Sequence, residues 1–139
     1  MKFVEYTARL TDEVVTIQLE QPCNCYVGLV EITMANFNKR NASQNVIDIT
    51  CDQIDSTFDN PSRSLRRVPF SRYPSNAYVT WVAQQPQMKK IDSNDKFLTL
   101  RFGRALGEPK ITFVKDNTIF FTLVFSESTT INWKSYISQ

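Results

Sequence analysis

Four arginines stand close together near the middle of the sequence and carry its clearest potential for binding chemistry. They are Arg63, Arg66, Arg67 and Arg72, with the aromatic residues Phe70 and Tyr73 among them. Guanidinium groups hold phosphate oxygens through hydrogen bonds, and aromatic rings stack on bases, so this segment could contact a polyanion. A charged strand edge that prevents edge-to-edge pairing explains the same residues, as does a contact with the carboxylates of a partner subunit.

The charge balance of the whole chain argues against nucleic acid as the partner of these arginines. Sixteen basic residues and 14 acidic residues give a formal net charge of +2, which leaves no overall electrostatic footprint for a nucleic acid. We therefore favour the strand-edge interpretation over nucleic-acid binding. A polyanion or partner contact remains the candidate binding role of the segment.

Catalytic and metal-binding constellations are scarce. The 139 residues include no histidine, which excludes Ser-His-Asp and Cys-His catalysis and every metal site that needs an imidazole. Asp48, Asp52 and Asp55 could serve acid–base chemistry or hold calcium, but their spacing fits no EF-hand, and we interpret them as a solvated strand face. We expect no catalytic residue, no cofactor and no metal ion, and hence a protein that is not an enzyme.

The three cysteines, Cys23, Cys25 and Cys51, cannot close a zinc site made of cysteine alone, which needs four thiolates. The closely spaced pair Cys23 and Cys25 could bind a soft metal or carry redox chemistry. We favour unpaired, partly buried thiols in a reducing compartment.

The elements that must position these residues are predicted to be strands. Apolar and polar residues alternate with a period of two in several runs, which is typical of half-buried β-strands. These runs include residues 13–20, 30–34, 47–51, 98–102 and 118–125. Eight or nine such runs, with turn-forming residues between them, predict an all-β fold: a single jelly roll or β-sandwich of about eight strands. We expect this domain to span residues 1–126 and residues 127–139 to form a C-terminal arm or an extra strand.

The run 118–125 differs from the others because both of its faces are apolar. Ile119, Phe121, Leu123 and Phe125 share one face, and Phe120 and Val124 share the other. Such a strand needs cover on both sides, since an exposed apolar strand promotes aggregation. The cover is either a loop or tail of the same chain or a second subunit. Candidate subunit-interface residues are Phe120, Val124, Trp133 and Tyr136.

Several short motifs occur in an order that resembles a known family. They are Val46–Ile54, which contains Cys51-Asp52; Ser64–Pro69, with Leu65-Arg66-Arg67-Val68-Pro69; Lys96–Arg101; Gly107–Phe113, with Gly107-Glu108-Pro109; and Phe121–Phe125. This order is similar to the C-terminal part of the jelly-roll structural proteins of Polinton/Maverick elements and adintovirus-like DNA viruses. The resemblance covers roughly residues 46–126 and carries no catalytic residue. It implies a jelly-roll fold and a role in a virion.

The resulting functional expectation is a non-enzymatic viral or virus-derived structural protein: a minor capsid, spike or capsid-like jelly roll. We expect it to self-assemble through apolar strand faces as a homo-oligomer, with a trimer favoured, and to contact other capsid proteins or a host receptor. The alternative is a lectin-like or tumour-necrosis-factor-like binding module that recognises a glycan or protein receptor. A hydrolase or isomerase on a cupin-like barrel is disfavoured because histidine ligands are lacking.

The location expected from the sequence is the virion or the cytoplasm or nucleus of a host cell. Charges at Lys2 and Glu5 argue against a signal peptide. No stretch approaches the roughly 20 apolar residues of a membrane helix, so we expect no contact with a membrane.

Overall fold

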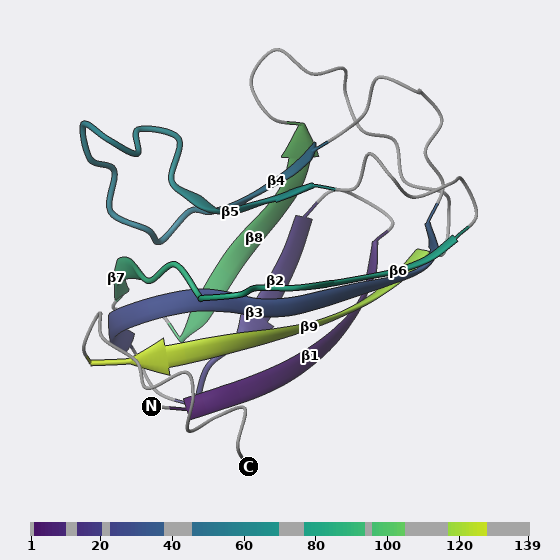
Figure 1. Ribbon diagram of the computed structural model, residues 1–139. Helices are drawn as coiled ribbons and strands as arrows, with labels where there is room; N and C mark the ends of the chain where they lie inside the picture. Colours follow the sequence, from purple (N-terminus) through teal and green to yellow (C-terminus); the bar gives the residue numbers. More distant parts are fainter. Residues whose placement is uncertain are drawn as a thin grey trace.

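Two antiparallel β-sheets packed face to face form the protein (Figure 1). The computed structural model describes residues 2–10, 14–20, 23–37, 46–69, 77–93, 96–104 and 117–127, and within them it contains strands and no helix. The five-stranded sheet contains β1 (Lys2–Leu10), β9 (Asn117–Ser126), β3 (Cys23–Phe37), β6 (Ala77–Val82) and β7 (Lys89–Ser93). The four-stranded sheet contains β2 (Val14–Gln18), β8 (Phe97–Arg104), β4 (Val46–Cys51) and β5 (Ser64–Pro69).

The strand pairing is that of a jelly roll. The first strand pairs with the last, β1 with β9, and the next pairs inward are β2 with β8, β3 with β6 and β7, and β4 with β5. Strands β6 and β7 both pair with the 15-residue strand β3, so together they occupy one strand position. The nine strands of the described residues therefore fill eight places. This nested order confirms the predicted all-β jelly-roll sandwich.

The core lies between the two sheets and follows from the alternation in the sequence. Strand β2 shows it most simply, because Val15 and Ile17 are buried while the residues on either side of them are exposed. Aromatic contacts join the layers: the Phe121 ring lies 5.4 Å from that of Tyr6 in its own sheet and 6.2 Å from that of Phe102 in the opposite sheet. Rings at such separations add stability beyond the area they bury.

We predict that the Phe121→Ala substitution lowers the free energy of unfolding by about 3–5 kcal/mol, because it leaves a cavity where the two sheets meet. The matched control is Phe58→Ala, since Phe58 is 100% exposed in the connection between β4 and β5. We expect that change to shift stability by no more than about 0.5 kcal/mol. Denaturant unfolding of both variants measures the difference, and equal effects would contradict the placement of Phe121 in the core.

Candidate functional site

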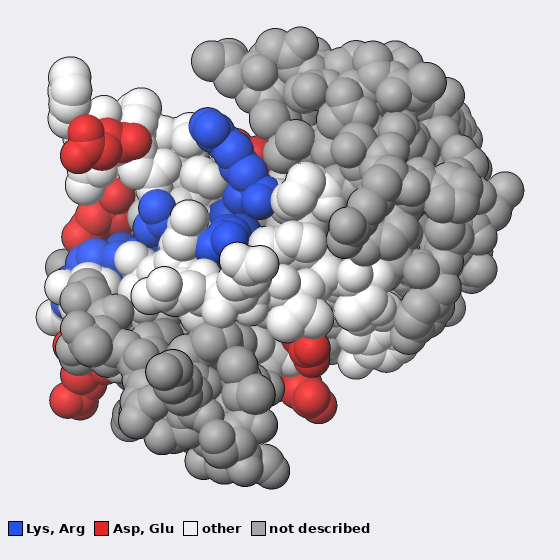
Figure 2. Space-filling view, viewed as in Figure 1, with Lys and Arg blue, Asp and Glu red and all other residues white. Residues whose placement is uncertain are grey.

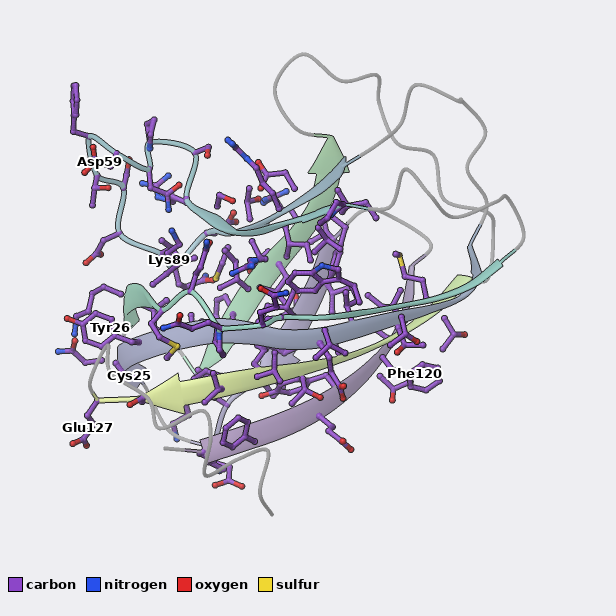
Figure 3. The ribbon with its side chains drawn as sticks, viewed as in Figure 1. Cys25, Tyr26, Asp59, Lys89, Phe120 and Glu127 are labelled. Carbon is purple, nitrogen blue, oxygen red and sulfur yellow. The ribbon has the colours of Figure 1, made fainter. Side chains whose placement is uncertain are left out.

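The outward face of the five-stranded sheet carries an exposed aromatic side chain, Phe120. Strand pairing places Thr7 and Thr33 on either side of it, with Thr80 beyond Thr33. Residues directly opposite each other in antiparallel strands point to the same face, so these four form one row across the sheet. Phe120 keeps 43% of its surface exposed and points away from the sandwich (Figure 3). A partner can therefore reach this predicted interface residue.

The neighbouring row extends this surface. Val82 lies opposite Glu31 and is 54% exposed. Thr122, on the other side of Glu31, donates a hydrogen bond from Oγ1 to Glu31 Oε1 at 3.3 Å. We call the surface formed by Thr7, Thr33, Thr80, Val82 and Phe120 the Phe120 face. It presents two exposed apolar side chains among threonines, and the carboxylates of Glu5 and Glu31 lie in the same row as Val82.

Val124 lies on the same side of β9 as Phe120 but has no exposed surface. Its neighbour across the sheet is Gly28 of β3. Residues 86–88 pass close over that glycine: a Cβ added to Gly28 would lie 2.8 Å from Met88 Sδ and 3.2 Å from Pro86 Cβ. The outward side of β9 is thus buried within the chain at Val124 and exposed at Phe120. In this arrangement the Val124 side chain is not available to a second subunit.

Five of the residues singled out in the sequence lie outside the described residues: Phe70, Arg72, Tyr73, Trp133 and Tyr136. Arg63, Arg66 and Arg67 are described, and the last two point in different directions. Successive residues of a strand face opposite ways, so Arg66 lies on the side of core residue Ile49 and Arg67 on the side of Asp48. A β-bulge precedes them in β5, where Leu65 is an extra residue between the pairs Thr50–Ser64 and Ile49–Arg66. A bulge re-aims the side chains of its strand.

The bulge directs Arg66 along the open edge of the sandwich toward the other sheet. Its guanidinium lies 5.0 Å from the ring centre of Trp81, and Nη1 donates a hydrogen bond to the Gln85 carbonyl oxygen at 3.3 Å. Partial burial lowers the pKa of Arg66 from its usual value. A cation over an indole ring contributes about 0.5–2 kcal/mol. Arg66 therefore links β5 to the opposite sheet and closes this edge of the core.

Arg67 projects to the outside of β5, where its side chain is 63% exposed. Its Nε lies 3.8 Å from Asp48 Oδ2, and Asp48 Oδ1 accepts a hydrogen bond of 2.6 Å from Ser64 Oγ. Asp48 is 7% exposed, so the expectation that it belongs to a solvated face was wrong. The bulge that shifts the register also brings Ser64 close enough to stabilise this buried carboxylate.

Asp52 and Asp55 are exposed, as the sequence predicted. Both Asp52 carboxylate oxygens accept hydrogen bonds of 2.9 Å from the Arg101 guanidinium. This paired contact is the main reason that the pKa of Asp52 is lowered. Within the described residues, no group of three or more histidine, cysteine, aspartate or glutamate side chains could hold a metal ion.

A polar hollow of about 360 Å³ lies where β5 faces β7 at the edge that Arg66 closes. Its cationic lining is Arg66, Arg67 and Lys89, and its other polar lining includes Asp59, Asn60 and Gln87. Figure 2 shows Lys and Arg side chains gathered across the middle of this face, with acidic side chains beside them. Sequence reasoning found the arginines but missed Lys89 and Gln87, because only the pairing of β7 with β3 brings them to β5.

A second hollow, of about 330 Å³, lies at the opposite edge, between β1 and the end of β2. Tyr6 and Phe125 line it, and an ion pair of 3.2 Å between Lys2 and Glu20 spans the two strands. Burial, together with the Glu20 charge, raises the pKa of Tyr6. Glu127, the last described residue, also lines this hollow.

The two cysteines whose side chains are described differ in state. Cys25 is disulfide-bonded, so the expectation of an unpaired thiol was wrong there. Cys51 is free and buried, as expected. Burial is the main reason that the pKa of the Cys51 thiol is raised to about 11.

Comparisons of the chain with protein-family models, with curated proteins and with solved structures find no match. No helix in the described part of the chain is long and apolar enough to span a membrane.

We predict that Cys51 of the folded protein resists thiol reagents at about pH 8 and reacts only after unfolding. Raising the pKa from 9.0 to about 11 reduces the thiolate fraction about a hundredfold, and thiolate is the reactive form. The unfolded chain loses the thiol proton near pH 9 and the folded protein only near pH 11, so the fold loses stability as the pH rises between these values. Mass spectrometry of labelled peptides measures the modification, and rapid labelling of the native protein would contradict the buried position.

Proposed function

We propose that this protein is a non-enzymatic structural protein, viral or virus-derived, of the minor capsid, spike or capsid-like jelly-roll kind. The observation that carries the proposal is the Phe120 face on a jelly-roll sandwich. A sheet that is well packed inside and keeps Phe120 and Val82 exposed outside has a surface suited to a partner. The occupant that we propose is a second copy of the chain.

The chemistry of the face supports association with another flat surface. Threonine hydroxyls that bond to water in the free protein can bond to a partner across a contact. The exposed Phe120 ring is an aromatic anchor of the kind that contributes most of the binding energy at interfaces. The side-chain hydroxyls of Thr33 and Thr80 lie 3.2 Å apart and already bond to each other, which lowers the cost of removing them from water. Full burial of one phenylalanine contributes about 1.5–3 kcal/mol.

The family resemblance supports the same proposal. Within the described residues, each quoted segment coincides with a strand or continues one: Val46–Ile54 begins with β4, Ser64–Pro69 is β5, Lys96–Arg101 leads into β8, and Phe121–Phe125 belongs to β9. Motifs that fall on four strands of one domain, β4, β5, β8 and β9, are what a shared jelly-roll ancestry would produce. On this basis we propose a homo-oligomer, a trimer in the first instance, in a virion or in the cytoplasm or nucleus of a host cell.

The proposed assembly also gives roles to the remaining candidate residues. Trp133 and Tyr136 in the arm 127–139 are proposed to contact a neighbouring subunit, because Glu127 leaves β9 beside the hollow between β1 and β2. Other capsid proteins or a receptor are proposed as further partners. The alternative function, a binding module for a glycan or protein receptor, is favoured by one observation, the polar hollow between β5 and β7.

We predict that the purified protein forms an oligomer and that Phe120→Asp converts it to a folded monomer of 16.1 kDa. Burying the new carboxylate at the contact would cost more than the contact supplies. Light scattering behind a sizing column measures the mass, and circular dichroism verifies the fold.

The matched control is Val14→Asp, because Val14 is 40% exposed on the opposite sheet, and we expect it to leave the mass unchanged. A wild-type monomer would overturn the proposed assembly. If the Phe120→Asp variant still forms the oligomer, the subunits meet through a surface other than the Phe120 face.

A further inference from the structure

The polar hollow between β5 and β7 has features of a small-ligand site that the assembly proposal does not use. Three structural features form this hollow: a bulge in β5, the register of β7 and the connection between β4 and β5. The first is the bulge that aims Arg66 along the edge. The second is the register of β7: Lys89 lies opposite Val27, a core residue, so its side chain projects from the inward side of the sheet toward β5. Figure 3 shows Lys89 between the two layers.

The third feature is the connection from β4 to β5, which hydrogen bonds hold in place. The Asn60 side chain donates a bond from Nδ2 to the Ser64 carbonyl oxygen and accepts one from the Ser64 backbone N–H at Oδ1, each of 3.0 Å. Arg63 completes the connection with a φ of 58°, a left-handed conformation that is uncommon for arginine. Asp59, next to Asn60, is thereby set at the rim of the hollow.

The donors and acceptors of the hollow form a mixed set. Arg66 and Arg67 are cations with fixed planar donors, and Lys89 makes no ion pair with any other described residue. The Asp59 carboxylate, in contrast to these cations, only accepts hydrogen bonds. The Gln87 amide both donates and accepts them. A ligand that combines a negative group with hydroxyls satisfies this set.

The distribution of charge selects a small ligand over a long polyanion. Nucleic acids are held by cations that follow a phosphate backbone over many charges. Here the cations are bounded by acids: Asp59 lies at the rim, and Asp48 lies 3.8 Å from Arg67 Nε. The volume of about 360 Å³ is within the range of sites for small molecules.

We propose that this hollow binds a single acidic sugar residue, in which a carboxylate or sulfate faces Arg67 and Lys89 and ring hydroxyls reach Asp59 and Gln87. The inference is independent of the proposed assembly, because none of these residues belongs to the Phe120 face. It identifies the chemistry that a receptor glycan would present to this edge of the jelly roll.

The test is a titration of the folded protein, followed by the side-chain amide and guanidinium resonances in nuclear magnetic resonance. The carboxylated probe is N-acetylneuraminic acid, the sulfated probe is N-acetylglucosamine 6-sulfate, and the neutral probe is N-acetylglucosamine. We expect dissociation constants on the order of 1 mM for at least one acidic probe, as is usual for a single small polar ligand, and at least about tenfold weaker binding of the neutral probe.

The pocket variant is Arg67→Gln with Lys89→Gln, and we expect it to weaken binding of the acidic probe by about tenfold or more. Its matched control is Lys2→Gln with Lys96→Gln, which changes the net charge equally at exposed positions outside the hollow. Arg66 is left intact because it supports the fold. An equal loss in the control variant would overturn the proposal.

A further variant, Asp59→Ala, separates a sugar from a bare anion. Removing a carboxylate should strengthen binding of inorganic sulfate but weaken binding of the acidic sugar, which loses a hydroxyl acceptor. If the Asp59→Ala variant binds both sulfate and the acidic sugar more tightly, the hollow recognises only the negative charge, and the sugar assignment is overturned. Absence of binding by both acidic probes, or retention of single-stranded DNA alone, would overturn the proposal as well.

Discussion

Both sides of β9 are apolar, and the need to cover them is the constraint on which the rest of the structure depends. This strand pairs with β1 and β3 at once, so its inward side chains must fill the space between the two sheets. Phe121 meets Phe102 there, and this contact joins the layers. The outward side has to be covered by other means. Residues 86–88 pass over the sheet next to Val124, whereas Phe120 stays exposed. The proposed assembly surface is therefore the part of β9 that the chain leaves open.

Polar residues cover two open edges of the sandwich. A two-layer sandwich leaves core exposed where the end strands of the layers diverge. Arg66 closes one such edge by lying over Trp81, and the Lys2–Glu20 ion pair spans the other. A side chain that closes an edge also shapes the surface beside it. The hollow between β5 and β7 exists because the bulge, the register of β7 and the hydrogen-bonded connection at Asn60 converge at one edge.

Local pattern was enough to predict most of the strands, because alternation reports directly which side of a strand is buried, but it did not reveal β7 (Lys89–Ser93). It predicted the all-β sandwich, the apolar character of both sides of the last strand, and the exposure of Asp52 and Asp55. Pattern did not reveal the burial of Asp48, since the bulge at Leu65 shifts the register and brings Ser64 to the carboxylate. Nor did it reveal that Val124 is buried, which depends on a segment remote in sequence. Lys89 was missed as a site residue for the same reason: its role depends on which strand β7 pairs with.

We propose that the Phe120 face joins copies of this jelly roll into an assembly. Electron cryomicroscopy of the concentrated protein is the direct test, because a map shows which surfaces of neighbouring copies meet. We expect closed oligomers in which the outward side of the five-stranded sheet, at Phe120 and Val82, packs against a neighbouring subunit. Particles joined through other surfaces with this face open to solvent, or a homogeneous monomer of 16.1 kDa, would contradict it.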